Sequence, residues 1–422
     1  MTRSTHSSQP HSRLQAFEIA LLVLCAVIVV LAAVFLINNR PPSITVPVQK
    51  MPKDNGWDDF VKAAEMIENV QHTVPDSPGT TVESLYVRRY ELSKRDFAPA
   101  LNVLRRGFKK PYLHPNDRFV SGTAFSPYSA FRETARVLLG EANYFEQIEQ
   151  PGGAANSRLD CIEFGVTLPR GGSMITALVG YAIEAMGTDR FARLLPKLNP
   201  AELAHVAGRL ESISKKRPPY SETVLNQGLT HTKESLQIFR APGHLKRMLN
   251  PYIWYDPDTW DRMTIPRELW DKARFSLANK TALIRENEAY HKEAAAEQQG
   301  PYTGDSKVPV PDNALSPVDV VAGRLKYAKG EAVLALIQTE VALRRYHFAH
   351  NRYPDKLAQL VPAYVKSVPV DPFGRGKPLK YKPLDGGKDF LLYSRGPNLR
   401  DDGGVPGRWR GTDTAGDLQL TK

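Results

Sequence analysis

The residues whose types and spacing could bind a metal ion lie near the end of the chain. Asn398, Asp401, Asp402, Asp413 and Asp417 fall in a segment that also contains five glycines. Carboxylate and amide oxygens in a flexible, irregular loop are the ligands that hard cations take. The residue types of this segment are therefore compatible with binding a hard cation. Against this, Val405 to Arg410 separate the acidic residues and add two arginines, so a solvated acidic tail is the alternative.

Catalytic motifs are absent from the sequence. It contains no Gly-x-Ser-x-Gly, His-Glu-x-x-His, P-loop or Gly-x-Gly-x-x-Gly pattern. Ser173 follows two glycines but precedes an apolar run, which predicts a helix N-cap. His347 and His350 share a helix face without a third ligand nearby, and Cys161 is typical of a buried helical cysteine. The sequence therefore favours a non-enzymatic protein over an enzyme.

An apolar segment near the start predicts a membrane anchor. Ile19 to Ile37 contains no charged residue and, at about 1.5 Å per residue, nearly spans a ~30 Å hydrocarbon core. No small-x-small site follows it, as a cleaved signal peptide would require. Residues 1–18 then form a short cytoplasmic tail, and residues 19–37 contact the lipid bilayer. We expect a single-pass protein of the inner, cytoplasmic membrane with most of the chain extracytoplasmic.

Composition limits the classes of partner. The chain has a formal charge of +11, but its basic clusters are scattered along the sequence rather than gathered. Nucleic-acid-binding proteins gather basic residues on one face, so we expect no nucleic-acid partner. The basic residues are predicted to lie on solvated helix faces beside anionic lipid. One of the two cysteines, Cys25, lies in the apolar segment, so no intrachain disulfide is expected in the soluble part.

The central part of the chain predicts a mostly α-helical fold. Residues 38–53 contain four prolines and predict an extended spacer, followed by a helical domain over 54–298. Apolar residues recur there at steps of three and four between Pro and Gly breaks, as in a helical bundle. The helix around residues 174–186 is the most apolar and is predicted to be the central one. Residues 299–316 predict a linker.

The C-terminal region, residues 317–422, predicts an α+β module. Ser316 and Pro317 begin a long amphipathic helix that ends near His350. A short helix is predicted over residues 357–361. Two strands, about 379–384 and 390–394, then form an antiparallel hairpin around an Asp-Gly-Gly turn.

The same region resembles the globular domain of the major pseudopilin of type II secretion systems. The resemblance covers about residues 330–418 and is carried by Asn351-Arg352-Tyr353-Pro354, by the turn from Lys366 to Gly374, and by the loop that opens at Tyr393. It implies that Asn398, Asp401, Asp402, Asp413 and Asp417 bind calcium. Two features differ from the family: Asn398 replaces an Asp, and the leader with its cleavage glycine is missing. The module therefore does not by itself imply a filament subunit.

Three hypotheses for function follow. The first is a membrane-anchored interaction or scaffold protein of the bacterial cell envelope, with envelope proteins as partners and a link to type II secretion. The second is an extracytoplasmic enzyme whose site is assembled from residues distant in sequence. The third is a sensor of calcium or another ligand. The sequence identifies neither the partner nor the oligomeric state.

Overall fold

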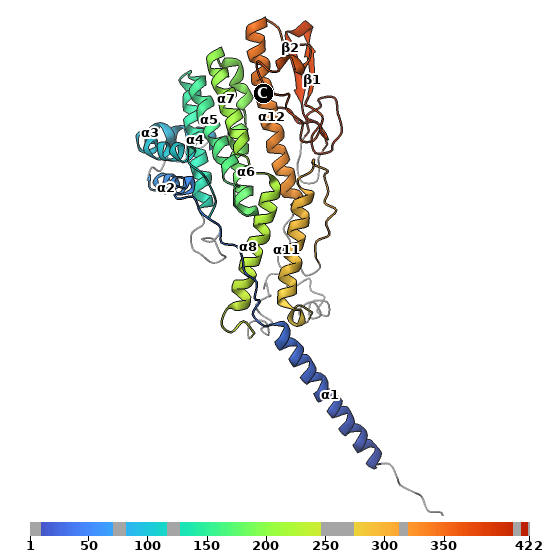
Figure 1. Ribbon diagram of the computed structural model, residues 1–422. Helices are drawn as coiled ribbons and strands as arrows, with labels where there is room; N and C mark the ends of the chain where they lie inside the picture. The colour runs from blue at the N-terminus through green and yellow to red at the C-terminus, as the bar shows by residue number, and fades with distance from the viewer. Residues whose placement is uncertain are drawn as a thin grey trace, which may run out of the picture. The chain divides into compact units, whose positions relative to one another are not determined.

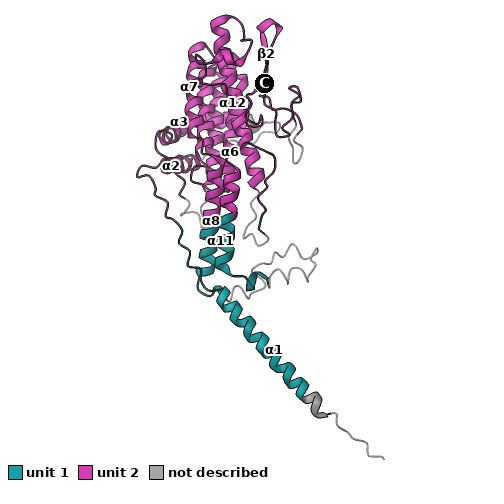
Figure 2. Ribbon diagram, turned by 45° about the vertical axis from the view of Figure 1, so that its right-hand side comes forward, with its two compact units in different colours: residues 1–46, 231–289, 311–316 teal, residues 47–230, 290–310, 317–422 magenta. Residues whose placement is uncertain are grey.

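The computed structural model describes residues 10–70, 82–115, 127–245, 274–311, 320–407 and 415–420, and most of them are helical (Figure 1). The α-helices are α1 (Pro10–Asn38), α2 (Gly56–Glu68), α3 (Val82–Gly107), α4 (Tyr128–Gln147), α5 (Pro151–Thr167), α6 (Met174–Thr188), α7 (Pro200–Lys216), α8 (Tyr220–Arg240), α11 (Lys280–Glu297) and α12 (Val320–His350). One antiparallel sheet contains β1 (Lys380–Leu384) and β2 (Asp389–Tyr393). The chain divides into two compact units (Figure 2).

The first unit contains residues 1–46, 231–289 and 311–316. Its helix α1 is longer than the predicted anchor and includes a stretch from Gln15 to Asn38 that is apolar and long enough to span a membrane. None of the most apolar part of this stretch is buried in the protein. Because an isolated helix with so much exposed apolar surface is unfavourable in water, this is one candidate membrane-spanning helix near the N-terminus.

Polar contacts hold the chain just after α1. Asn39 donates from Nδ2 to the carbonyl of Ser276 at 2.7 Å, and Asn38 donates to that of Leu277 at 2.7 Å. The Arg240 guanidinium, at the end of α8, donates to the carbonyls of Pro42 and Ile44, both at 2.7 Å from Nη2. Residues 38–44 of the predicted spacer are therefore bonded to the ends of two helices of this unit.

The second unit contains residues 47–230, 290–310 and 317–422. Helices α2 to α7 begin and end close to where prolines, glycines and N-caps predict. Asn55 caps α2: its Oδ1 accepts from the backbone N–H of Trp57 at 3.2 Å and of Leu113 at 3.1 Å. Asn199 and Glu202 form a capping box at the start of α7. Ser173 occupies the N-cap position of α6 as predicted, although its side chain makes no cap hydrogen bond.

Helix α5, rather than the predicted α6, is the central helix of this unit. From Ala154 to Thr167 all residues of α5 except Asn156 are buried, and it packs against α4, α6 and α7. On α6, Ile175 is 54% exposed. The prediction was wrong because it rested on apolar composition alone, whereas the charged residues of α5 are buried in ion pairs.

The long helix α12 belongs to the core of the second unit. Leu334, Ile337 and Val341 are buried in one apolar cluster with residues of α5 and α7. Another face of α12 packs against the β1–β2 hairpin through a cluster that contains Leu336, Phe390 and Leu392. The predicted hairpin is confirmed, with Lys380 opposite Tyr393 and Leu384 opposite Asp389, and its turn is Asp385–Gly387.

Some predictions fall on residues outside the described part of the chain. These are the helix start at Ser316 and Pro317 and the predicted ligand Asp413. The short helix predicted after Pro354 is a 3-10 turn, Leu357–Leu360.

Candidate functional site

The predicted cation-binding loop brings three of its five residues together. Asn398 donates from Nδ2 to Oδ2 of Asp402 at 2.7 Å. The same Asp402 oxygen accepts from the backbone N–H of Gly416 at 3.1 Å, and the Asp402 N–H donates to Oδ1 of Asp417 at 3.3 Å. Residues 398–402 and 416–417, which lie apart in sequence, therefore meet side by side.

A fourth predicted ligand, Asp401, makes other contacts. Asp401 accepts from the Tyr393 hydroxyl at 2.9 Å and contacts the Lys380 ammonium at 2.6 Å. Asp413 lies outside the described residues. Within the described part of the chain, no set of three or more His, Cys, Asp or Glu side chains is placed to hold a metal ion.

The chemistry of the loop fits a cation only in part. Asp417 is 1% exposed, and its Oδ2 accepts from the backbone N–H of Gly404 at 2.6 Å. Burial raises the pKa of Asp417, and the neighbouring charges of Asp402 and Asp401 add to the rise although backbone donors oppose it. A cation would relieve this repulsion, but the donors already bonded to Asp402 and Asp417 would have to turn away. The calcium site stays a prediction.

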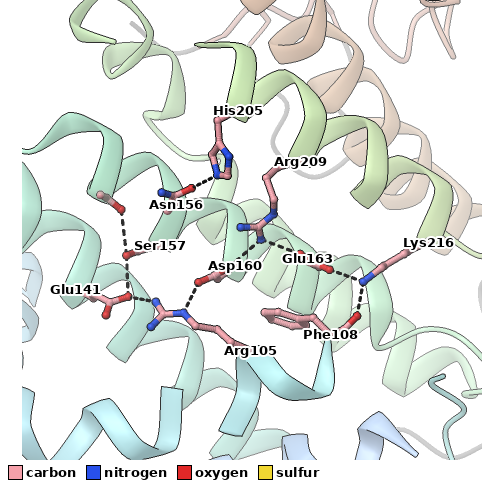
Figure 3. Close-up of polar contacts among 11 residues, drawn as sticks. Arg105, Phe108, Glu141, Asn156, Ser157, Asp160, Glu163, His205, Arg209 and Lys216 are labelled. Atoms are coloured by element: carbon pink, nitrogen blue, oxygen red, sulfur yellow. Dashed lines mark hydrogen bonds and ion pairs between the residues drawn. The ribbon is translucent and has the colours of Figure 1, made fainter. Parts of the chain in front are cut away.

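A row of connected charged side chains runs between helices of the second unit (Figure 3). Arg105 of α3 binds Glu141 of α4 and donates from Nε to Asp160 of α5 at 2.7 Å. Arg209 of α7 donates from Nη2 to Asp160 and to Glu163, both at 2.8 Å. These residues form an alternating row of cations and carboxylates, here called the charge row, that joins four helices.

Both ends of the charge row are also bonded. Lys216 of α7 binds Glu163 and donates to the backbone carbonyl of Phe108 at 2.6 Å. At the other end, the Ser157 hydroxyl donates to Glu141 at 2.7 Å. Burial alone would lower the pKa of Arg105, but the charges of Glu141 and Asp160 outweigh it and raise that pKa. Arg105 therefore keeps its charge, and each carboxylate of the charge row contacts a cationic side chain.

A second buried ion pair joins α6 to the chain that enters α8. Arg217 donates to Glu184, and the side chains are 7% and 2% exposed. The Arg217 guanidinium also lies 5.4 Å from the ring centroid of Tyr327 on α12. The basic clusters that contain Arg105, Lys216 and Arg217 are therefore partly internal, whereas the sequence predicted solvated helix faces.

The remaining candidates for catalysis are also engaged in packing. Burial raises the pKa of the Cys161 thiol to about 12, so this thiol is not a nucleophile at neutral pH. His205 lines a hollow of about 590 Å³ at the start of α5, together with Glu202. However, His205 bonds Asn156 at 2.9 Å and Glu202 belongs to the capping box of α7. Glu202 therefore stabilises the start of α7, and His205 joins α7 to α5.

A second hollow, of about 670 Å³, lies between α7 and the segment 362–369. We call it the α7 groove. It is lined by Glu211 and Lys215 of α7, by Arg345 of α12, and by Tyr364 and Lys366 of the segment. Its walls combine small, aromatic and charged side chains, which is the composition of surfaces that bind other molecules.

Comparisons with known proteins gave no match. The chain matches no protein-family model, no curated protein and no solved structure. The resemblance to the major pseudopilin therefore stays a prediction from the sequence.

Sequence reasoning did not find the α7 groove. Glu211 and Lys366, which form an ion pair across it, are 155 residues apart in the chain. The segment that contains Lys366 also belongs to the proline-rich turn pattern, which indicated a structural role. The one available signal was the run of small residues Ala204, Ala207 and Gly208 on one face of a helix.

Proposed function

We propose that this protein is a membrane-anchored interaction or scaffold protein of the bacterial cell envelope, with most of its chain outside the cytoplasm. The observation that carries the proposal is helix α1, whose apolar stretch is left uncovered by the rest of the protein. Such a surface needs lipid around it. The proposal places the residues before this helix in the cytoplasm and those after it outside.

The state of the charged groups in the helical core supports an interaction role over catalysis. Acid–base catalysis requires a group whose proton is free to move toward a substrate. The carboxylates of Glu141, Asp160, Glu163 and Glu184 are instead bound to arginine or lysine. The hollow that contains His205 and the α7 groove are concave, but neither brings a nucleophile into contact with a base. Such surfaces are better suited to binding a molecule than to cleaving a bond.

The link to type II secretion is part of the same proposal. The order of parts that resembles a pseudopilin is a long helix, a Tyr-Pro, a hairpin and an acidic loop. Helix α12, residues Tyr353 and Pro354, strands β1 and β2 and the loop 398–417 follow one another in that order, which supports the resemblance. Calcium binding by the loop belongs to the proposal as the property that the resemblance implies.

Cross-linking on intact membranes tests the proposal. The full chain is produced in a bacterial host, cross-linked in membranes with a lysine-reactive reagent, solubilised and examined by mass spectrometry. We expect cross-links to other envelope proteins. A result in which only the free monomer is recovered, while a known membrane complex in the same sample is cross-linked, would refute the scaffold role.

A C-terminal alkaline phosphatase fusion tests the topology. This enzyme is active only outside the cytoplasm because it needs its disulfides. We expect activity from the fusion to Lys422 and none when residues 15–38 are deleted. An inactive, stable full-length fusion would show that the bulk of the chain faces the cytoplasm.

A further inference from the structure

The α7 groove has an unbalanced arrangement of charge. Two ammonium groups share one oxygen: Lys215 lies 2.7 Å from Oε1 of Glu211, and Lys366 contacts the same atom. These ion pairs lower the pKa of Glu211 to about 2, with Lys215 the larger cause and Lys366 the second. Glu211 is thus fully ionised at neutral pH, yet its single negative charge faces two positive ones.

A third cation lies in the same hollow. Arg345 donates from Nη1 to the backbone carbonyl of Tyr364 at 3.3 Å and lies 5.5 Å from the centre of its ring. Among the residues that line the groove, the charged ones are therefore Lys215, Arg345 and Lys366 against Glu211. The surplus of positive charge is open to solvent, since the Lys215 and Lys366 side chains are 67% and 77% exposed.

The backbone along one wall is open as well. Within the described part of the chain, the N–H groups of Lys366, Ser367 and Val368 donate to no other group. Lys366 and Ser367 are exposed. Unpaired backbone donors beside lysine side chains are groups that bind carboxylates and peptide carbonyls.

The opposite wall leaves space for a bound chain. A Cβ atom built on Gly208 of α7 would meet no atom within 4 Å. The neighbouring lining residues Ala204 and Ala207 are also small. A ligand can therefore approach this face of α7 closely, whereas Tyr364 and Val365 offer apolar contact from the other side.

We propose that the α7 groove binds an acidic segment of a partner protein, with its carboxylates at Lys215, Lys366 and Arg345 and its apolar side chains against Tyr364. This inference rests on the proposed interaction function and specifies the chemistry of the partner. Carboxylates of the partner would neutralise the surplus positive charge of the lysines and Arg345 around Glu211. A hollow of about 670 Å³ is also larger than a single small anion needs.

Fluorescence anisotropy tests the inference with the full chain in nanodiscs of zwitterionic lipid. The probe is a fluorescein-labelled decapeptide of alternating Glu and Ala, and the control peptide has Gln in place of Glu. We expect the Glu peptide to bind at least about tenfold more tightly, and its affinity to fall about tenfold when salt is raised from 50 to 300 mM. Equal affinity of the two peptides, or no binding of the Glu peptide at about 1 mM, would overturn the inference.

Two leucine substitutions on α7 locate the binding. Gly208→Leu fills the groove, and we expect at least about a tenfold loss of affinity. Ser212→Leu adds the same side chain at an exposed position of α7 that does not line the groove, and should leave affinity within about twofold. Gly208→Leu should not unfold the protein, because the site is open and leucine favours a helix more than glycine does.

A second variant tests whether lost binding reflects misfolding, and a second measurement locates the bound peptide. Lys366→Gln removes one cation from an exposed side chain and should weaken the Glu peptide without affecting thermal unfolding. Hydrogen exchange should show protection of the amides of residues 366–368 when the Glu peptide binds. If Gly208→Leu binds as well as the unaltered protein, or if citrate alone displaces the peptide at equal carboxylate concentration, the groove is not a peptide site. Membrane cross-links that persist in that case would leave the proposed function standing.

Discussion

Removing the negative charge of Glu184 should strongly destabilise the helical unit. The Arg217 guanidinium is 7% exposed and Glu184 is 2% exposed, so water cannot replace the lost partner. Breaking a buried ion pair on one side costs about 3–5 kcal/mol, because the remaining charge stays buried without compensation. In the native protein Glu184 outweighs burial, which alone would lower the pKa of Arg217, and raises that pKa. An arginine side chain is effectively always protonated in proteins, so Arg217 stays charged in the variant after its partner is lost.

The measurement is urea unfolding of purified Glu184→Gln, followed by far-ultraviolet circular dichroism in a mild non-ionic detergent. With a slope of about 3 kcal/mol per molar urea, a loss of about 3 kcal/mol lowers the unfolding midpoint by about 1 M. Glu211→Gln is the control, because Glu211 is an exposed member of an ion pair and should not shift the midpoint measurably.

A double substitution separates the cost of the orphaned charge from the value of the pair. Glu184→Leu together with Arg217→Met replaces both charges by apolar side chains, and such replacements are often neutral or stabilising. We expect the double variant to recover most of the lost stability. A double variant as unstable as Glu184→Gln, or a Glu184→Gln midpoint equal to that of the unaltered protein, would refute the reasoning.

Three further predictions concern single residues. Cys161 should not react with a thiol reagent in the native protein at pH 8, because burial raises its pKa to about 12, and should react fully in urea; rapid native labelling would contradict its burial. Burial lowers the pKa of Lys280 to about 8, below its unfolded value near 10.5, so its buried charge opposes folding at low pH and this cost decreases as pH rises between those values. Lys280→Met should therefore flatten the rise of the urea midpoint between pH 8 and 10.5, and an unchanged pH profile would refute this. Millimolar calcium should release heat on titration into the full chain and not into Asp417→Asn; no difference between the two would remove the site.

The positions of the helices could be predicted from local sequence because local signals determine them. Asn55 caps α2 and Asn199 caps α7, and Pro151 and Pro200 are the first residues of α5 and α7. The hairpin followed from alternation of residue types around an Asp-Gly-Gly turn. These features depend on residues only a few positions apart, so they can be recognised in a single sequence.

The interior of the unit could not be predicted in the same way. Asp160 and Glu163 make α5 look solvent-facing until their partners, Arg105 and Arg209, are placed on α3 and α7. Whether a charged side chain can be buried depends on a partner that lies far away in the sequence. Arg105 and Asp160, for example, are 55 residues apart. The α7 groove was missed for the same reason, whereas the acidic residues of the loop 398–417 lie within one segment of the sequence and could be proposed as a site from it.

The chain beyond the anchor was also only partly predicted. Prolines indicated an extended segment after residue 38, which the structure contains. They could not indicate that Arg240 binds the carbonyls of Pro42 and Ile44, since this contact joins residues about 200 positions apart.

Extraction of membranes with alkaline carbonate tests the central claim, that α1 anchors the protein in a lipid bilayer. The full chain is expressed in a bacterial host, and its membranes are washed at pH 11 and sedimented. We predict that the protein remains in the pellet and that a variant lacking residues 15–38 appears in the supernatant. Recovery of the intact full-length chain in the soluble fraction would contradict the account.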